Sequence, residues 1–228
     1  MKKKILVTRK LLIENEEKLK ELFDVKLNSK DELYTSDKII ELSKDCDGIL
    51  SAITDQFNKD LIEKLSPSIK IIANFAVGFG NIDVNAAAKK NIVVTNTPEV
   101  LDDSTADISI LLLLGASRKV LEARRAAELQ NWKWSADFML GKQMSNKRLG
   151  ILGMGRIGRA VAKRARGFNM EIHYHNRSQL PKDLEEGAIY HKTVKDLFNC
   201  SDFLSINCPA TKETNKIINK ETIAFLPD

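Results

Sequence analysis

The sequence contains few cysteines and no long apolar run, and each scarcity narrows the class of protein. The three cysteines, Cys46, Cys200 and Cys208, are odd in number and show no CxxC spacing, which disfavours a disulfide framework and a zinc site. We therefore expect no bound metal and a reducing, cytoplasmic environment. The longest apolar stretch, residues 108–116, is much shorter than the roughly 20 residues that span a membrane, so no membrane partner is expected.

Neither sign of charge dominates the chain. The 228 residues include 36 Lys and Arg against 31 Asp and Glu, and the basic residues are scattered along the sequence. Because no basic stripe is evident, we expect no nucleic-acid partner. A hydrophobic content of 43% with 29% charged residues is typical of globular proteins, and the length allows two domains.

Short apolar segments of strand-like composition alternate with helical patterns on both sides of a central segment, which predicts two open α/β units with parallel sheets. In the first unit we expect helices at 58–65 and 83–90, and strands at residues 4–7, 24–27, 48–51, 69–73 and 92–95. In the second we expect helices at 157–166 and around 217–225, and strands at residues 148–152, 170–175, 188–190 and 203–207. The expected fold class is α/β, with two Rossmann-like or flavodoxin-like domains joined by a long helix.

The segment between the two units is expected to form this helix and an arm. Asp102, Asp103 and Ser104 can cap a helix N-terminus, and the apolar block that follows predicts one helix over residues 102–129. Residues 130–146 lack regular periodicity and contain both tryptophans. They therefore indicate an arm whose aromatic side chains find a partner surface.

The most informative motif is GMGRIG at residues 153–158, which follows an expected strand and begins an expected helix. Gly153 permits the tight turn, Gly155 lets the backbone approach a pyrophosphate, and Gly158 allows the helix to pack closely on the strand. The helix N-terminus then points at the anion. This context predicts dinucleotide binding; the alternative is a glycine-rich turn that serves packing only.

The end of the next expected strand predicts which dinucleotide binds. An NAD-specific site carries an acidic residue about 20 positions after the glycines, whereas this chain has Asn176, Arg177 and Ser178 there. Arg177 can pair with a 2′-phosphate that a carboxylate would repel, and its two neighbours can donate hydrogen bonds. We therefore expect NADP, with NAD less favoured; the alternative is that Arg177 is a solvated loop charge.

With the glycine loop in place, four stretches resemble the D-isomer-specific 2-hydroxyacid dehydrogenases, in particular their glyoxylate/hydroxypyruvate reductase branch. They follow the family's order over nearly the whole chain: AVGFGNID at 76–83, NTP at 96–98 with TAD at 105–107, residues 149–158, and NCP at 207–209 with ET at 213–214. The resemblance implies a substrate-binding domain at 1–101, a linker helix and dimerisation arm at 102–146, and an NAD(P)-binding Rossmann domain at 147–228. It implies a homodimeric oxidoreductase that transfers hydride between NADP(H) and a small 2-keto acid such as glyoxylate or hydroxypyruvate.

The resemblance also implies roles for individual residues. Val77 and Gly78 would offer backbone amides to the substrate carboxylate, and Trp134 would reach a neighbouring subunit's substrate pocket. Cofactor contacts would come from Thr105, Gly153, Gly155, Arg156, Ile157, Gly158, Asn176, Arg177, Ser178, Pro209 and Thr214. Two alternatives stay open, since Val77 also fits a core position and Trp134 also fits packing beneath the arm.

The acid-base residues of the family, an arginine, a carboxylate and a histidine, would by this resemblance lie beyond the end of the sequence. The three histidines, His173, His175 and His191, match no catalytic motif, and the first two, which flank the cofactor strand, are expected to be structural. A Rossmann domain is expected to have six strands, so the four expected here leave residues 203–207 as an unpaired apolar edge. We therefore expect an incomplete second domain in a fragment or truncated product whose activity alone is in question.

Two rival functions remain at this point. A chain without its acid-base histidine could act as a non-catalytic module that binds a dinucleotide and reports redox state. An NAD-using relative of the phosphoglycerate type is a second alternative, and Arg177 disfavours it.

Overall fold

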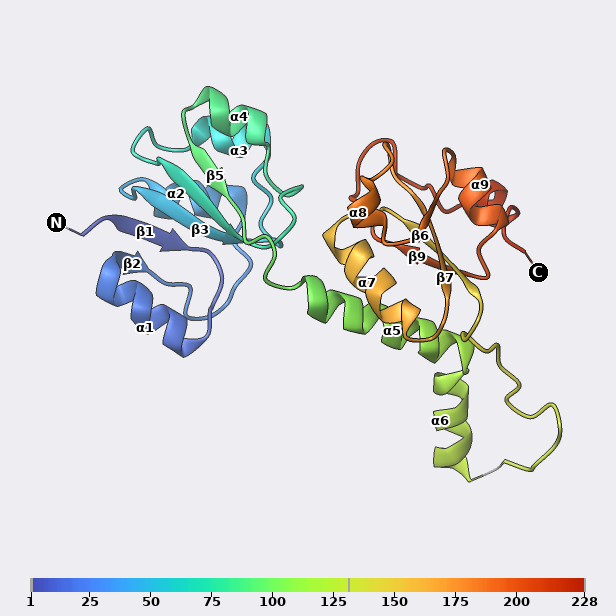
Figure 1. The fold of residues 1–228 in the computed structure, drawn as a ribbon. Coiled ribbons are helices and arrows are strands. Elements are labelled where there is room, and N and C mark those ends of the chain that lie inside the picture. The colour runs from blue at the N-terminus through green and yellow to red at the C-terminus, as the bar shows by residue number, and fades with distance from the viewer. Residues whose placement is uncertain (1, 131, 228) are drawn as a thin grey trace. The chain divides into compact units, whose positions relative to one another are not determined.

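The computed structural model describes residues 2–130 and 132–227. The chain divides into two compact units, Met1–Val100 and Leu101–Asp228. Each unit is built on its own parallel sheet, as Figure 1 shows. The expected α/β fold class with two parallel-sheet domains is therefore confirmed.

The first unit has five parallel strands in the order β2-β1-β3-β4-β5. The strands are β1 (Lys4–Val7), β2 (Asp24–Lys26), β3 (Gly48–Ala52), β4 (Ile71–Phe75) and β5 (Val93–Thr95). The helices are α1 (Ile13–Leu22), α2 (Ser36–Ser43), α3 (Lys59–Lys64) and α4 (Val84–Lys89). All five expected strands are present, although β4 begins two residues later than predicted.

One core supports this first sheet. Ile39 of α2, Leu61 of α3 and Ala87 of α4 belong to the same buried cluster as Leu6 and Ile72 of the sheet. Helices α2, α3 and α4 begin where a polar side chain accepts a backbone amide, as the Asn58 side chain does at α3, which satisfies a donor that the helix itself leaves unpaired. This packing fixes the carboxyl ends of the strands, from which the loops of the candidate site emerge.

The second unit has four parallel strands in the order β8-β7-β6-β9. The strands are β6 (Arg148–Leu152), β7 (Glu171–His175), β8 (Ile189–Tyr190) and β9 (Phe203–Ile206). The helices are α5 (Asp102–Ser117), α6 (Val120–Leu129), α7 (Arg156–Arg166), α8 (Lys182–Glu185), α9 (Val194–Asn199) and α10 (Lys220–Ile223). Numbered from β6, the order is 3-2-1-4, which is the first part of the dinucleotide-binding order.

Helices α7 and α9 cover opposite faces of this second sheet (Figure 1). Leu149 and Ile151 of β6 share a buried cluster with Val161 of α7, whereas Leu152 packs with Leu197 and Phe198 of α9. The alternation along β6 is the reason, because successive side chains of a strand point to opposite faces. Strands buried on both faces in this way are typical of parallel α/β sheets.

The expectation of one continuous helix over residues 102–129 is wrong. α5 ends at Ser117 and α6 begins at Val120, with Lys119 between them in the left-handed region at φ 51°. A residue in that conformation cannot continue a right-handed helix, so the chain changes direction there. Within the described residues, no helix has the length and apolar character required to cross a membrane.

The acidic residues at the start of α5 do not cap it. No side chain makes a cap hydrogen bond at its N-terminus, and the Ser104 hydroxyl donates to the Leu101 carbonyl. Asp103 instead forms an ion pair with Arg164 of α7 at 3.0 Å, and Asp107 accepts a hydrogen bond from the same guanidinium at 2.5 Å. α5 thus packs on α7 and is part of the second unit, in addition to connecting the two.

Two short helices were not predicted from the sequence. α8 and α9 contain four and six residues, too few for a helical period to show, and neither was expected. Thr193 caps the N-terminus of α9, because its side chain accepts the Asp196 amide. α10 is likewise shorter than the helical stretch expected around residues 217–225.

The segment after α6 contains no helix or strand over its described residues 132–146; Asn131, part of the expected arm, lies outside the described residues. Trp134 is 81% exposed, while Trp132 stacks on Phe138 with ring centroids 6.1 Å apart. The alternative that Trp134 packs beneath the arm is therefore wrong.

Strand β9 lies at the edge of the second sheet and pairs, within the described part of the chain, with β6 alone. Its last residue, Ile206, is 48% exposed. The expected apolar edge at residues 203–207 is therefore present in this structure, although its final residue, Asn207, lies outside the strand.

Candidate dinucleotide and substrate sites

The glycine loop runs from the carboxyl end of β6 into the first turn of α7. Gly153 has a φ of +93°, and a Cβ atom there would lie 2.5 Å from the Cys208 amide nitrogen. A Cβ atom at Gly158 would lie 2.5 Å from the Gly153 carbonyl oxygen. Contacts this short exclude a side chain, so these two positions carry the turn and the close helix packing.

Gly155 differs from its two neighbours in the motif. A Cβ atom built on it would meet no atom within 4 Å, because the position faces open space. Packing within the chain therefore gives no reason for glycine there. A ligand that must approach the backbone does give one, and α7 begins immediately after it, at Arg156.

Asn176 braces the glycine loop from the end of β7. Its side-chain oxygen accepts the Met154 amide at 2.7 Å, and its amide group lies 3.4 Å from the Met154 carbonyl oxygen. The Gly153 amide donates to the His175 carbonyl at 3.0 Å. Sequence reasoning placed Asn176 near the cofactor ribose and missed this second contact, which joins residues 22 positions apart.

A second loop faces the glycine loop where the strand order reverses. The Asn207 amide donates to the Leu152 carbonyl at 2.8 Å, and the Cys208 backbone packs against Gly153. The loop is closed by Thr214, whose hydroxyl donates to the Pro209 carbonyl at 2.6 Å. Ligands of open α/β sheets bind at such a switch point between neighbouring strands, here β6 and β9.

Arg177 and Ser178 extend from the end of β7 into solvent and are both exposed. The pKa of the Glu213 carboxyl lies below its usual range, chiefly because Thr211 hydrogen-bonds it and in smaller part because Arg177 is positive and near. The structure thus brings Arg177 and the 209–214 loop together at the carboxyl end of the sheet.

The start of α5 contributes the remaining expected cofactor residues of this unit. Thr105 is half-buried in the first turn of α5. Arg156 lies 3.4 Å from a carboxylate oxygen of Asp102, and Ile157 packs against the buried cluster beneath α7. The first turns of α5 and α7 are therefore held together beside the glycine loop.

The expected substrate-carboxylate loop follows β4 in the first unit. The Val77 carbonyl accepts a hydrogen bond from Asn96 at 2.8 Å, and the Gly78 carbonyl accepts one from Asn74 at 3.0 Å. Asn74 is itself buried and bonds Asn81 at 3.1 Å. Val77 is half-buried and Gly78 exposed, so the loop's carbonyls are held by side chains of the unit while the loop stays accessible.

Sequence reasoning missed the roles of Asn74 and Asn81, the two buried asparagines beside this loop. The one signal in the sequence was a polar residue inside an otherwise apolar strand, at position 74. It also missed that His173, His191 and Cys200 converge on one another in the second unit.

A hollow of about 590 Å³ in the second unit is a different feature from the glycine loop. Its lining includes Lys147, Asp202 and Phe203, which lie at the amino ends of β6 and β9. Ligands of such sheets bind at the carboxyl ends, so we do not assign the dinucleotide to it.

Comparison with known proteins decides the family. The model of the D-isomer specific 2-hydroxyacid dehydrogenase NAD binding domain matches residues 110–228, which include the glycine loop and all four strands of the second sheet. The chain belongs to the D-isomer specific 2-hydroxyacid dehydrogenase family. The resemblance noted from the four sequence stretches is thereby confirmed.

Individual members of the family agree with this assignment. A glyoxylate reductase of Korarchaeum cryptofilum is 41% identical over 226 residues, which are 98% of this chain and 68% of the relative. A crystal structure of a D-isomer specific 2-hydroxyacid dehydrogenase from Polaromonas superposes with a TM-score of 0.90 at 38% identity, over 100% of this chain and 72% of that one. An NADPH-dependent glyoxylate/hydroxypyruvate reductase from Sinorhizobium meliloti, solved with NADP and malonate, gives 0.83 at 29% identity, over 99% and 68%.

Proposed function

We propose that this chain supplies the substrate-binding and dinucleotide-binding parts of an oxidoreductase of the glyoxylate/hydroxypyruvate reductase type. The substrate-binding part would comprise residues 1–101, the linker and arm 102–146, and the dinucleotide-binding part 147–228. The observation that carries the proposal is the glycine loop with an open Gly155, at the switch point of a 3-2-1-4 sheet.

The loop fits a dinucleotide. The open space at Gly155 is a cradle for the pyrophosphate, and Gly153, Gly158 and the Asn176 brace hold the backbone in the shape that leaves it open. The bound nicotinamide cofactor supplies the hydride equivalent for reduction of a keto carbon. Arg156 and Ile157 would hold the pyrophosphate, whereas Thr105, Pro209 and Thr214 would contact the rest of the cofactor.

NADP is proposed over NAD because of the residues at the end of β7. Arg177 is exposed where an NAD-specific site carries a carboxylate, and Asn176 and Ser178 beside it can donate hydrogen bonds to a 2′-phosphate. The Sinorhizobium relative, solved with NADP, supports this choice. The positive charge of Arg177 contributes to the lowered pKa of Glu213, so the phosphate would compete with that carboxylate for the guanidinium.

The substrate is proposed to be a small 2-keto acid such as glyoxylate or hydroxypyruvate. Backbone amides at Val77 and Gly78 would bind its carboxylate, because this loop's carbonyls already have side-chain partners. The exposed Trp134 would reach the substrate pocket of a second subunit, making the arm a dimerisation device. The Korarchaeum relative, a glyoxylate reductase, supports the substrate class.

Proton transfer is proposed to need residues that this chain does not provide. His173 contacts Glu171 and His191, and the His175 ring lies 2.9 Å from the His191 carbonyl oxygen. Both rings are therefore engaged within the second sheet. We propose that the chain binds the dinucleotide by itself, and that turnover requires the further region that the family's longer members contain.

The test has two arms. Titration of the chain with NADPH, followed by fluorescence, is expected to show saturable binding that Gly155→Ala weakens at least tenfold and that Gly115→Ala, at another glycine facing open space, preserves. Glyoxylate-dependent NADPH oxidation is expected only in a protein extended by the C-terminal region of its relatives. Absence of NADPH binding to the folded chain would contradict the dinucleotide assignment, and an inactive extended protein would contradict the reductase assignment.

A further inference from the structure

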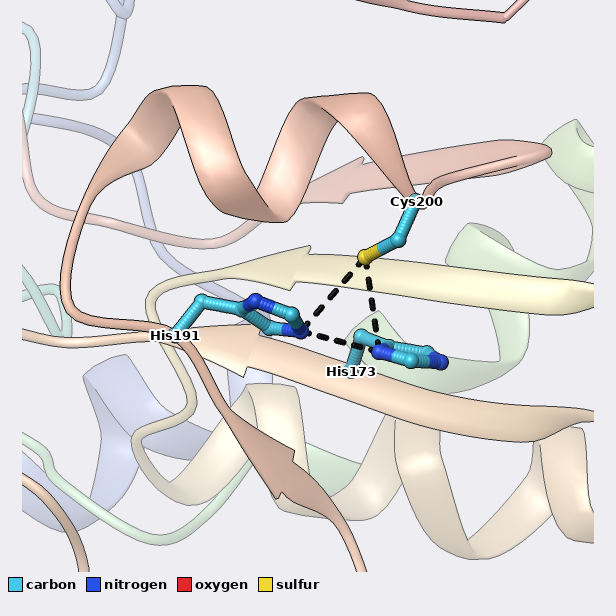
Figure 2. Close-up of side chains that lie close together, drawn as sticks. All are labelled: His173, His191 and Cys200. Atoms are coloured by element: carbon cyan, nitrogen blue, oxygen red, sulfur yellow. Dashed lines mark hydrogen bonds between the residues drawn. The ribbon is translucent and has the colours of Figure 1, made fainter.

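Three ligand atoms converge between the second sheet and α9, on the face opposite α7. His173 lies on β7, His191 directly after β8, and Cys200 directly after the last residue of α9, and Figure 2 shows the three side chains turned toward one another beneath the helix. His173 Nδ1 lies 2.9 Å from His191 Nε2, and Cys200 Sγ lies 3.4 Å from each of these nitrogens. None of these residues belongs to the dinucleotide site proposed above.

We propose that His173, His191 and Cys200 form a binding site for Zn²⁺. Zinc binds imidazole nitrogen at about 2.0–2.1 Å and thiolate sulfur at about 2.3 Å in tetrahedral geometry, which places two nitrogens about 3.3 Å apart and nitrogen and sulfur about 3.6 Å apart. The three observed separations are 2.9, 3.4 and 3.4 Å. The donor atoms therefore already lie within a few tenths of an ångström of one face of that tetrahedron.

Glu171 completes an arrangement that is characteristic of metal-binding histidines. The second ring nitrogen of His173, Nε2, lies 2.5 Å from a carboxylate oxygen of Glu171. A carboxylate there fixes the proton on Nε2 and leaves the Nδ1 lone pair facing His191 and Cys200. Glu171 is thus a positioning residue, and its negative charge compensates part of the charge of the ion.

The ligands come from β7 and from the residues that directly follow β8 and α9, which makes the site a cross-link within the second unit. His173 is 6% exposed and anchored in the middle of β7, whereas His191 and Cys200 are half-buried at the two ends of the segment that contains α9. A water molecule can reach the half-buried side and occupy the fourth position. Of the metals that borderline-soft nitrogen and sulfur ligands select, Zn²⁺ suits this set.

Binding of Zn²⁺ releases the proton of the Cys200 thiol. In the metal-free chain the Cys200 thiol lies 3.1 Å from the Leu197 carbonyl, to which it donates, and His191 and His173 share a hydrogen bond. The sulfur gives its proton to solvent when the Zn–S bond forms. His191 then bonds the ion through Nε2 and carries its proton on Nδ1, so no oxidant or reductant is needed.

Cobalt(II), which takes the place of Zn²⁺ in such sites, gives a direct readout of the thiolate ligand. The chain is stripped with a chelator, dialysed and titrated with CoCl₂. We expect one equivalent to bind with a thiolate-to-cobalt charge-transfer band in the near ultraviolet and to be displaced by ZnCl₂. Cys200→Ser should lose this band, and Cys208→Ser, which removes another half-buried thiol of the same unit, should keep it.

Zinc affinity, measured by competition with a chromophoric chelator, tests the two other residues. We expect His191→Gln to weaken binding at least tenfold, and Glu171→Gln to weaken it tenfold to a hundredfold, as for other carboxylates behind a metal-bound histidine. Glu221→Gln, on exposed α10, is the matched control and should bind as wild type does. Either of two results would overturn the proposal: a folded wild-type chain that shows no charge-transfer band, or a band that survives in Cys200→Ser. The first result is obtained with wild type alone and so does not depend on whether the variants fold.

Discussion

The side chain of Asn176 holds the backbone of Met154 at the tip of the glycine loop. It accepts the Met154 amide at 2.7 Å and directs its own amide group to the Met154 carbonyl oxygen at 3.4 Å. The end of one strand thus fixes the shape of the turn that leaves its neighbour. An anion-binding turn gains affinity when its amides are held in place before the ligand arrives.

Asn176→Ala is therefore expected to weaken NADPH binding more than it weakens the fold. Without the hydrogen bond the backbone of Met154 is free to move and must be ordered when the ligand binds, at a cost of about 1–2 kcal/mol, which corresponds to a rise in the dissociation constant of roughly fivefold to thirtyfold. Fluorescence titration measures the change. Asn199→Ala, at the exposed end of α9, is the control, and equal affinities of wild type and Asn176→Ala would show that the brace does not matter.

Gly155→Ala separates ligand binding from stability. Among the described residues, the new methyl group would meet no atom within 4 Å beyond its chain neighbours, and alanine restricts the unfolded chain more than glycine does. Gly155 is the N-cap residue of α7, where alanine is less favourable than glycine, and this loss opposes the gain from the restricted unfolded chain. We expect the free energy of unfolding to change by less than about 1 kcal/mol, while NADPH affinity falls at least tenfold because the methyl group occupies the pyrophosphate cradle.

Gly153→Ala provides the contrast. Its methyl group would lie 2.5 Å from a backbone nitrogen at a φ of +93°, so we expect a loss of stability of more than about 1 kcal/mol. Urea unfolding of both variants tests the pair. If Gly155→Ala lost stability as Gly153→Ala does, the open space at Gly155 would have a structural cause and not a ligand.

A role could be predicted from the sequence where the interacting residues are close together along the chain. The roles of Gly153 and Gly158 could be predicted because a strand, a turn and a helix that are adjacent in sequence define them. The partner of Asn176 could not, because the contact spans 22 residues and depends on the pairing of β6 with β7. Sequence order predicted which residues gather at the carboxyl ends of the strands, but not which of them touch.

The convergence of His173, His191 and Cys200 was invisible for the same reason. The residues lie 18 and 9 positions apart, and a six-residue helix that showed no period brings the cysteine over the sheet. Cysteine spacing alone disfavoured a metal site, because that argument covers only ligands that are close in sequence.

The break between α5 and α6 illustrates a local limit. Arg118 and Lys119 are ordinary helix formers, and nothing in their sequence marks a turn. The left-handed conformation of Lys119 arises where the Lys142 amide donates to the Ser117 carbonyl at 2.9 Å, a contact from a segment 25 residues away. Tertiary packing overrides intrinsic helix propensity at this point.

Arg177, the residue proposed to bind the 2′-phosphate, lies near enough to Glu213 for its charge to contribute to the lowered pKa of that carboxyl. Arg177→Ala is expected to weaken NADPH binding by about 1.5–3 kcal/mol, the range for hydrogen bonds to charged groups, and to leave NADH binding unchanged. Glu213→Gln should do the opposite and strengthen NADPH binding, since it removes a carboxylate that competes for the guanidinium and repels the phosphate.

Isothermal titration with NADPH and NADH measures the affinities of wild type and of both variants for each dinucleotide. Lys212→Ala, a neighbouring exposed cation in the same loop, is the control for a general loss of positive charge, and only a small effect is expected from it, because exposed charges are screened by salt. Equal losses of NADPH and NADH affinity in Arg177→Ala would contradict a role in recognising the phosphate.

The ion pair between Arg9 and Asp31 in the first unit should make a pH-dependent contribution to the free energy of unfolding. Arg9 Nε and Nη2 donate to the two carboxylate oxygens of Asp31 at 2.8 and 3.0 Å, and the Lys10 amide donates to one of them. The Arg9 hydrogen bond, with the Lys10 amide next, lowers the pKa of Asp31 to about 2 from an ordinary 3.8. Because the folded value is the lower one, the stabilisation is present above pH 3.8 and is lost as pH falls through about 2.

Asp31→Asn isolates this term, since asparagine tolerates the left-handed backbone at this position, where φ is 55°. The variant is expected to have a lower urea midpoint than wild type at pH 7 and the same midpoint near pH 2, with the difference closing across the interval between the two pKa values. Circular dichroism follows the unfolding. Glu32→Gln, at the adjacent exposed carboxylate, should differ less from wild type in urea midpoint at pH 7. If wild type kept its higher urea midpoint over Asp31→Asn unchanged at pH 2, the charge of the Arg9 pair would contribute nothing to stability.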